Sequence, residues 1–237
     1  MCIIFFAYKT DPARPLIVAA NRDEFYHRPT ASAARWSDHP SIHAGRDLVH
    51  GGAWLGITDS GRFAAVTNFR DPAAPNGPRS RGDLVRDFLT SDVGPMQYLA
   101  DIESVASDFS GFNLIVGDTS ELCYFSNRGD VPRRLDAGIY GLSNHLLDTP
   151  WPKVRNGRKE FGDALAGGEI SADNLFAVLG DKTLAPDDEL PETGIGYERE
   201  KLLSAIFIET PVYGTRSSAV VIADSQWRLS LEERTFV

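Results

Sequence analysis

Two kinds of apolar pattern alternate along the chain, and their order limits the folds that it can adopt. Short β-branched and aromatic runs joined by turn residues predict β-hairpins, whereas apolar side chains at three- and four-residue spacing predict helices. The hairpin patterns occupy residues 2–20, 54–68, 112–127 and 216–236, with a further strand at 138–144. The helical patterns occupy residues 80–91, 96–105, 151–167, 171–181 and 198–207. Hairpins that alternate with helices indicate an α+β fold in which antiparallel sheets carry helical layers.

Nothing in the sequence divides these segments into separate units. The 237 residues contain no internal repeat, and a chain of this length buries roughly 70–75% of its unfolded surface. We therefore expect one domain over residues 1–237, stable without disulfides. The acidic, proline-containing stretch at 185–194 is the part expected to pack least.

Composition excludes several classes of function. The chain is 42% apolar and 24% charged, which is typical of a globular protein. Its net charge of -9 argues against a nucleic-acid partner, since binding to phosphate backbones depends on clustered Lys and Arg. The longest apolar run near the start, residues 2–8, is too short to span a membrane and lacks the flanks of a signal peptide. Because Cys2 and Cys123 are the only cysteines, we expect a reducing, cytoplasmic compartment and no disulfide.

Cys2 directly follows the initiator methionine. One interpretation is a small buried apolar residue at the start of a strand. The position also suits removal of Met1, which would leave a thiol and a free α-amine on one residue. Their reference pKa values are about 8.5 and about 7.7–8.0, so a nucleophile and a base would lie together near neutral pH. Such a nucleophile needs a group that holds the amine and donors that stabilise an oxyanion.

The second strand-like run ends in four polar residues, Asn21-Arg22-Asp23-Glu24. In a hairpin with residues 2–8, this end returns close to residue 2. Asp23 is then placed to orient the amine of Cys2, and Arg22 to balance the charge of Asp23. Asn21, Arg22 and Glu24 are candidates for binding substrate. A polar turn after a buried strand is the alternative interpretation.

Other polar residues stand at comparable strand ends. Asn68 follows the run at 63–67, Asn144 follows the run at 138–143, and Arg216 begins the last hairpin. Asn side chains are suitable oxyanion donors, and Arg suits a buried or bidentate contact with an anion. Each of these residues alone is also explained as part of a turn or a cap.

Seven segments carry a resemblance to a known family. They read MCIIFFAY, AANRDEFYHRP, GGAWLGIT, VTNFRDP, SRGDLV, YGLSNHLLDTPWPKV and YGTRSS…ERTF, and they extend from residue 2 to Phe236. In order and spacing they resemble the NRDE family, the family of transport and Golgi organisation protein 2. That family is similar in turn to the N-terminal nucleophile hydrolases. The similarity implies a four-layer αββα sandwich, with two antiparallel sheets between helical layers.

The resemblance also implies roles for individual residues. In the choloylglycine hydrolase and penicillin acylase branch, an N-terminal Cys is the nucleophile and a strand-end Asp contacts its amine. Cys2 and Asp23 match those positions. Asn68 and Asn144 resemble the two asparagines of that branch, one of which is an oxyanion donor, and Arg216 is similar to its late arginine.

The implied reaction is hydrolysis of an amide or thioester bond in a small acyl substrate. The sulfur of Cys2 attacks the carbonyl, and Asn144, helped by Asn68 or a backbone N–H, holds the oxyanion. No metal or organic cofactor is required. One position departs from the pattern: that branch has an arginine where this chain has Ala19, and whether Arg22 replaces it is left open.

A carrier function is the alternative. Members of the family have been linked to intracellular haem and lipid handling, so haem is an alternative, transported ligand. Haem ligation needs a well-placed His, Cys, Met or Tyr. The five histidines suit ordinary surface or hydrogen-bonded roles: His27, His39, His43, His50 and His145. A thiol redox function is disfavoured because Cys123 stands alone and no C-x-x-C pattern occurs. The sequence does not indicate the oligomeric state.

Overall fold

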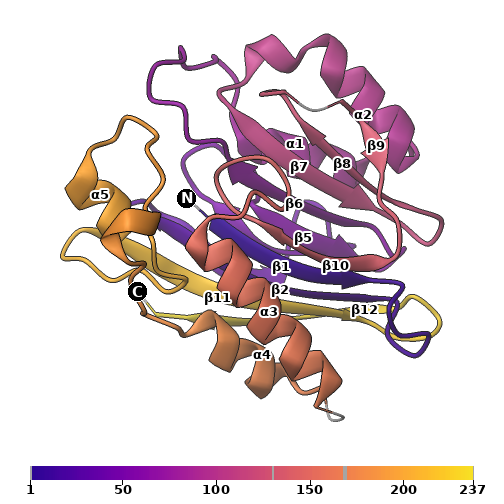
Figure 1. Ribbon diagram of the computed structural model, residues 1–237. Helices are drawn as coiled ribbons and strands as arrows, with labels where there is room; N and C mark the ends of the chain where they lie inside the picture. Colours follow the sequence, from indigo (N-terminus) through magenta and orange to yellow (C-terminus); the bar gives the residue numbers. More distant parts are fainter. Residues whose placement is uncertain (1, 130, 168–169, 237) are drawn as a thin grey trace.

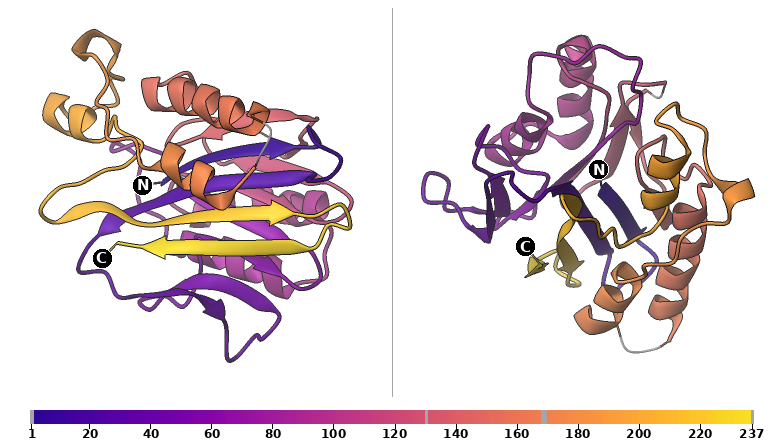
Figure 2. Two further views of the ribbon diagram at one scale, coloured as in Figure 1. Left: turned by 90° about the horizontal axis from the view of Figure 1, so that it is seen from below. Right: turned by 90° about the vertical axis from the view of Figure 1, so that its left-hand side faces the viewer.

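The fold combines two antiparallel sheets with two layers of helices. The structure is a computed structural model that describes residues 2–129, 131–167 and 170–236. The sheets pack face to face, and helices cover the outer face of each sheet (Figure 1, Figure 2). The expected α+β class and its four-layer αββα arrangement are confirmed.

The smaller sheet contains Cys2 and the NRDE segment. Its strand order is β10-β1-β2-β11-β12, and all neighbouring strands are antiparallel. The five strands are β1 (Cys2–Tyr8), β2 (Leu16–Phe25), β10 (Gly138–Leu142), β11 (Tyr213–Ala223) and β12 (Leu229–Thr235). The β1–β2 register places Cys2 opposite Arg22. The predicted return of the NRDE segment to residue 2 is therefore confirmed.

The larger sheet has the strand order β3-β4-β5-β6-β7-β8-β9. Its strands are β3 (Thr30–Arg35), β4 (Ile42–Asp47), β5 (Leu55–Thr58), β6 (Phe63–Asn68), β7 (Phe112–Gly117), β8 (Leu122–Ser126) and β9 (Arg133–Arg134). The α-helices are α1 (Arg81–Thr90), α2 (Pro95–Ser104), α3 (Pro152–Ala166), α4 (Ala172–Leu179) and α5 (Tyr197–Leu202). Two short 3₁₀ turns are η1 (Ala106–Asp108) and η2 (Asp187–Glu189).

Three apolar clusters fill the three interfaces of this sandwich. The central cluster, between the sheets, includes Ile4 and Phe6, and the cluster beneath α3 and α4 includes Ile3 and Phe5. The third lies between the larger sheet and helices α1 and α2. Because successive side chains of a strand point to opposite faces, β1 is buried on both faces. This explains its uninterrupted apolar run.

Most elements predicted from the sequence are confirmed. The four predicted hairpins form as β1–β2, β5–β6, β7–β8 and β11–β12. Helix α1 begins where its capping pattern predicts, and the hydroxyl of Ser80 accepts a hydrogen bond from the main-chain N–H of Gly82. Both helices that cover the smaller sheet also occur within their predicted ranges.

Two segments differ from the sequence prediction. The apolar pattern does not reveal β3 and β4, because most side chains of β3 are exposed and show no alternation. The helix predicted over 198–207 ends at Leu202. Beyond it the chain turns inward, where the main-chain N–H of Phe207 bonds to the carbonyl of Asp181 instead of continuing the helix.

Most residues of the stretch at 185–194 are exposed, as its composition predicts. Ala185 is buried, Glu189 pairs with Arg155 at 2.6 Å, and Asp187 pairs with Lys201. Apart from Ala185 the stretch therefore has little packing of its own, as expected, and its acidic side chains contact cations of α3 and α5 at the surface.

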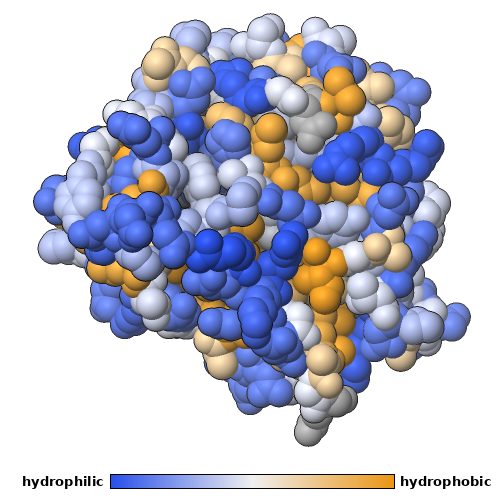
Figure 3. Space-filling view, viewed as in Figure 1, coloured by the Kyte–Doolittle hydropathy of each residue, from blue (hydrophilic) through white to orange (hydrophobic). Residues whose placement is uncertain are grey.

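The outer surface is largely polar. On the face seen in Figure 3, hydrophilic side chains predominate and apolar ones form scattered patches. Among the helices that the structure describes, none is both long enough and apolar enough to cross a lipid bilayer.

Candidate active site at Cys2

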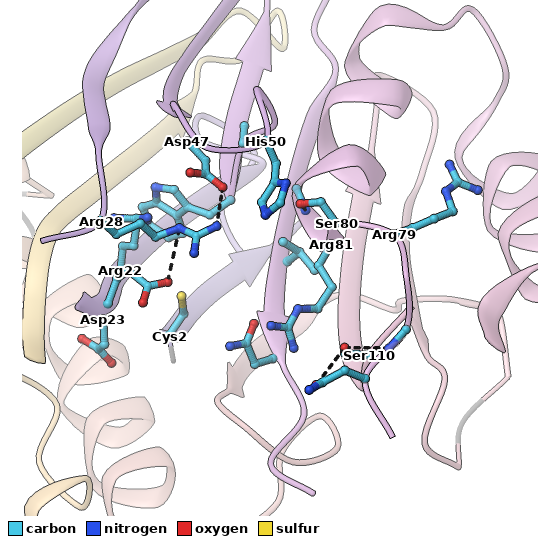
Figure 4. Close-up of a pocket in the computed structure, with 18 residues that line it drawn as sticks. Cys2, Arg22, Asp23, Arg28, Asp47, His50, Arg79, Ser80, Arg81 and Ser110 are labelled. Atoms are coloured by element: carbon cyan, nitrogen blue, oxygen red, sulfur yellow. Dashed lines mark hydrogen bonds and ion pairs between the residues drawn. The ribbon is translucent and has the colours of Figure 1, made fainter. Parts of the chain in front are cut away.

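Cys2 lies in the wall of a cavity of about 510 Å³. The residue begins β1, and 7% of its surface is exposed. The cavity wall comes from the end of β2, from β6, and from the chain just before and within the start of α1. Figure 4 shows the thiol of Cys2 between Arg22 and Asp23 on one side and Arg81, the first residue of α1, on the other. Cys2, the cysteine that the sequence predicts to be a nucleophile, therefore has a cavity beside it.

Asp23 is held beside Cys2 by hydrogen bonds from β11. The hydroxyl of Thr215 donates to Oδ1 of Asp23 at 2.8 Å, and the hydroxyl of Tyr213 donates to the main-chain oxygen of Asp23 at 3.1 Å. Burial raises the pKa of the Asp23 carboxyl, while the nearby charges of Lys153 and Arg22 act in the opposite direction. The carboxyl is therefore fixed in place and electrostatically coupled to its surroundings.

The thiol of Cys2 responds to the same environment. Burial raises its pKa, the charge of Asp23 raises it further, and the charge of Arg22 lowers it. A buried thiol is a weak nucleophile unless a base or a cation assists it. Deprotonation of the Cys2 thiol therefore requires a nearby base or positive charge, which a terminal amine or the cations of the site can supply.

Two arginines of the cavity wall, Arg22 and Arg81, form no salt bridge with a carboxylate of the described residues. The Arg22 side chain is only 6% exposed, and its Nη1 atom is buried without a hydrogen-bond partner among the residues described. Arg81 donates from Nη1 to the carbonyl of Gly111 at 3.1 Å. By contrast, Arg28 pairs with Asp47 at 2.7 Å. Arg22 and Arg81 are consequently suited to contact an anionic or strongly polar group in the cavity.

Asn68 and Asn144 come together as predicted, but they occupy different positions. Asn68, at the end of β6, lines the cavity. Asn144 is fully buried behind it, and its Nδ2 atom donates to the main-chain oxygen of Asn68 at 3.0 Å. Ser143 lies within hydrogen-bond distance, at 3.2 Å, of both the Asn144 Oδ1 atom and the carbonyl of Cys2. Asn68 is thus the asparagine with access to the cavity, and Asn144 supports its backbone.

Asn21 and Arg216 do not reach the cavity wall. Asn21 is fully buried, and its Nδ2 atom donates to the carbonyls of Leu179 and Ile206 at 2.9 and 3.0 Å. Arg216 donates to the carbonyls of Phe25 and Arg28 at 3.1 and 2.7 Å. These hydrogen bonds join distant parts of the chain to β2 and to the turn that follows it. The geometry therefore gives both residues positioning roles, whereas Arg22 and Glu24 do line the cavity.

An apolar groove of about 640 Å³ adjoins the Cys2 cavity. The two share the wall residues Glu24, Arg28, Asn68 and Arg81. The remaining wall of the groove includes Leu203 and the exposed side chains of Phe25, Leu202 and Val212. Together the cavity and the groove can receive a molecule with a polar part beside Cys2 and an apolar part along α5.

Several residues of the site are absent from the candidates that the sequence suggested. Arg28 and Arg81 belong to this group, and they lie inside the segments AANRDEFYHRP and SRGDLV. Their membership in these segments was the available signal. It did not identify them, because a charged residue in a loop or a first helical turn is most simply explained as exposed.

The described part of the chain contains neither a cluster of metal ligands nor a disulfide. It contains no group of three or more His, Cys, Asp or Glu side chains suited to hold a metal ion. Cys2 and Cys123 are both buried and free, and burial raises the pKa of Cys123 to about 12. Cys123 is therefore an inert core residue.

Comparison with known proteins agrees with the fold and with the resemblance seen in the sequence. All of residues 1–237 match the family described as Transport and Golgi organisation 2. The Transport and Golgi organization protein 2 homologs of Bos taurus and Homo sapiens are 40% and 38% identical to the chain, covering 100% of it and 94% of their own length. The Drosophila melanogaster protein is 31% identical over 99% of the chain and 92% of its own length.

Solved structures share the fold at low sequence identity. The Caenorhabditis elegans ortholog of N-acylethanolamine-hydrolyzing acid amidase superposes with a TM-score of 0.57 at 11% identity, over 100% of both chains. A mutant conjugated bile acid hydrolase from Clostridium perfringens gives 0.54 at 8% identity, over 100% of this chain and 97% of its own. This chain belongs to the Transport and Golgi organisation 2 family and has the fold of the N-terminal nucleophile hydrolases.

Proposed function

We propose that this protein is a hydrolase that cleaves amide or thioester bonds of small acyl substrates, with Cys2 as its nucleophile. The observation that carries the proposal is the position of the Cys2 thiol in a cavity wall, next to a buried carboxyl and two arginines without carboxylate partners in the described chain. A cysteine that served only to fill the core would not need an adjoining cavity or charged neighbours.

The reaction begins with removal of Met1, which frees the α-amine of Cys2. The amine accepts the thiol proton, and Sγ forms a bond to the carbonyl carbon. The side chain of Asn68, placed by Asn144, donates to the resulting oxyanion. The bond from this carbon to the leaving nitrogen or sulfur then breaks, and the leaving group takes the proton from the amine. Water attacks the acyl-Cys2 thioester, the C–S bond breaks, and the free acid leaves as the thiol regains a proton.

The surrounding residues orient this chemistry. Asp23, held by Thr215, is the partner for the amine of Cys2. Arg22 contacts a polar or anionic group of the substrate next to the scissile bond, and Glu24 borders both the cavity and the groove. An apolar acyl or leaving group extends along the groove toward Leu202. The reaction needs no metal ion and no organic cofactor.

A carrier is the second candidate, because a cavity that continues into an apolar groove can also hold an amphiphile without turnover. In this role the protein would bind a haem-like or lipid ligand and release it unchanged. The two functions differ in what they require of Cys2. A hydrolase loses all turnover without the thiol, whereas a carrier keeps its ligand unless the thiolate ligates haem iron.

The deciding experiment compares wild type with Cys2→Ala on a panel of acyl amides and thioesters, after intact-mass analysis has established whether Met1 is removed. We expect wild-type turnover that disappears in Cys2→Ala, and a mass increase of one acyl group on the wild type alone when an acylating probe is added. Cys123→Ala is the matched control and should keep both. Uniform retention of Met1, or no turnover together with stoichiometric haem binding by wild type and Cys2→Ala, would contradict the hydrolase.

A further inference from the structure

A buried polar network runs from the larger sheet to the segment that carries Asn144, and the mechanism above does not use it. Thr67 on β6 and Asn113 on β7 are 1% and 0% exposed, and the two residues lie opposite each other in the paired strands. By strand alternation they share the inner face of the sheet with Ala65 and Ile115, which belong to the apolar cluster between the sheets. Polar side chains at such positions are costly unless they are hydrogen-bonded, so their partners indicate why they are there.

Asn113 uses both sides of its side-chain amide. Its Nδ2 atom donates to the hydroxyl of Thr67 and to the carbonyl of His145, each at 3.0 Å. Its Oδ1 atom accepts from the hydroxyl of Tyr124 at 2.9 Å, and that hydroxyl accepts from the main-chain N–H of Leu147 at 3.1 Å. Asn113 and Tyr124 therefore hold the backbone of both His145 and Leu147 to the larger sheet.

The hydroxyl of Thr67 extends the network to the Cys2 site. It donates to the carbonyl of Ser143 at 2.7 Å, and the hydroxyl of Ser143 lies 3.2 Å from the carbonyl of Cys2. The next residue, Asn144, donates to the main-chain oxygen of Asn68 at 3.0 Å. One short segment thus contacts the backbone of the nucleophile and the backbone of the asparagine in the cavity wall.

Stability alone does not require this network. Replacing hydrogen-bonded partners in a protein core by apolar groups of the same shape can be nearly neutral or stabilising. A buried polar network whose members are all satisfied instead makes the arrangement of the groups that it joins rigid and unique. Here the joined groups are the end of β6, which carries Asn68, and the chain after β10, which carries Asn144.

We propose that Thr67 and Asn113 are positioning residues of the Cys2 site. Their hydrogen bonds hold the chain after β10 against β6, and through Asn144 they fix Asn68 relative to the thiol. Neither residue belongs to the described wall of the cavity. The role rests on the proposed function, in which the oxyanion forms at a point set by the new bond to Sγ. A donor displaced by about 1 Å from that point loses much of its effect.

The test compares variants that differ in one hydroxyl. Thr67→Val removes the hydroxyl and keeps the shape of the side chain, whereas Thr67→Ser keeps the hydroxyl. Thr58→Val is the matched control, because Thr58 is a threonine of β5 that is 4% exposed and whose hydroxyl accepts from the main-chain N–H of Arg62 at 3.0 Å. Tyr124→Phe removes the hydroxyl at the far end of the network and is the second variant if Thr67→Val does not fold.

Two reagents separate the position of the oxyanion donor from the reactivity of the thiol. With either one, the Cys2 thiol first gives its proton to the amine. With p-nitrophenyl butyrate, Sγ then bonds to the ester carbonyl carbon through an oxyanion, the C–O bond breaks, and p-nitrophenolate leaves. With iodoacetamide, Sγ bonds to the methylene carbon and iodide leaves, so no oxyanion forms. Both rates are measured by intact mass in a Cys123→Ala background, where Cys2 is the one remaining cysteine, with Cys2→Ala as the blank.

We expect Thr67→Val to lower the ratio of the acylation rate to the alkylation rate by about tenfold or more, which is part of the roughly 100–1000-fold effect of losing an oxyanion donor. Thr67→Ser and Thr58→Val should keep the wild-type ratio. A substitution that merely weakens the fold changes both rates together and leaves their ratio unchanged.

A third measurement does not need a reactive thiol. Hydrogen exchange of the Asn144 side-chain amide reports its bond to Asn68, and it is followed by NMR of protein labelled with ¹⁵N-asparagine, with Asn144→Asp to assign the signal. We expect exchange to be about tenfold faster in Thr67→Val than in wild type, because the segment opens locally when the bond to Ser143 is lost. Thr58→Val should exchange at the wild-type rate.

A folded Thr67→Val variant that keeps the wild-type ratio of rates would overturn the inference, and so would equal changes of that ratio in Thr67→Val and Thr58→Val. If wild-type Cys2 reacts with neither reagent, the hydrolase is contradicted and the exchange measurement decides alone. Wild-type exchange of Asn144 in Thr67→Val would then overturn the inference, and faster exchange would support it. The failure of one proposal is therefore distinguishable from the failure of the other.

Discussion

At the scale of single residues, burial of the Asp23 carboxyl makes the stability of the fold depend on pH. The carboxyl is almost completely buried, and burial raises its pKa in the folded state. The folded protein therefore binds this proton more tightly than the unfolded chain does. By linkage, the contribution of Asp23 to stability is present below its unfolded pKa and is lost as the pH rises through its folded pKa.

This sign leads to a prediction for Asp23→Asn, which resembles the protonated carboxyl in size and has no charge. The variant should unfold at a higher temperature than wild type at pH 7, and the two melting temperatures should converge below about pH 4, where unfolded Asp is protonated. Melting curves measured against pH test this expectation. Asp163→Asn, on an exposed part of α3, is the control for removing a carboxylate elsewhere.

Greater stability should accompany weaker catalysis. If Asp23 holds the amine of Cys2, Asp23→Asn should reduce acyl turnover about 100-fold or more, the usual contribution of a positioned acid–base group. A variant that is more stable and retains full turnover would show that Asp23 has no role in the reaction.

At the scale of elements, the contact between α3 and β1 depends on a glycine that the helix pattern does not explain. A Cβ atom on Gly157 would lie 2.2 Å from the ring of Phe5 and 2.7 Å from Ile206. Both neighbours are buried and have little freedom to move. The close approach of α3 therefore requires a residue without a side chain at this turn of the helix.

Two Gly→Ala changes in α3 should consequently act in opposite directions. Gly157→Ala should destabilise the protein by about 1–3 kcal/mol through overpacking. Gly162→Ala meets only Ile139 at an ordinary 3.5 Å, so it should stabilise the helix by about 0.5–1 kcal/mol through better helix propensity. Free energies of unfolding, measured by urea titration of both variants and the wild type, test these two predictions. Equal effects of the two substitutions would disprove the packing argument.

At the scale of the whole molecule, a buried ion pair joins parts of the chain that lie far apart in sequence. Arg70 follows β6 of the larger sheet, and Glu200 lies on α5. Their side chains are 5% and 4% exposed, and the main chain of Arg70 donates to the carbonyl of Asn144 at 2.7 Å. The ion pair thus joins the segment that follows Asn68 in sequence to α5, the helix that borders the apolar groove.

Breaking this pair should have a large effect. Glu200→Gln leaves Arg70 as a buried charge without its carboxylate and should lower the free energy of unfolding by about 3–5 kcal/mol. The exposed pair of Lys159 and Asp163, at 2.6 Å, offers the comparison. Lys159→Gln should cost less than about 1 kcal/mol. Similar losses in both variants, measured by urea titration, would be inconsistent with a structural role for the buried pair.

The sequence by itself determined the elements with strong local patterns and the fold that follows from their order. Hairpin β1–β2 and helix α1 were predictable because turn residues, caps and apolar periodicity act within a few residues. The same local signals placed Cys2 opposite the NRDE segment, since a hairpin register depends only on the turn and the two strands. Strands β3 and β4 and the true end of α5 lacked such signals.

Tertiary structure alone decided which polar residues share the cavity. Asn21 and Asn68 both stand near strand ends in the sequence, yet one is enclosed by carbonyls from distant segments and the other faces the cavity. Likewise, Arg81 lines the Cys2 cavity only because α1 packs on the larger sheet. Burial and electrostatic coupling depend on every group that surrounds a side chain, and most of these groups come from remote parts of the chain. Local sequence therefore specifies the strand that carries the nucleophile, and packing specifies its chemical environment.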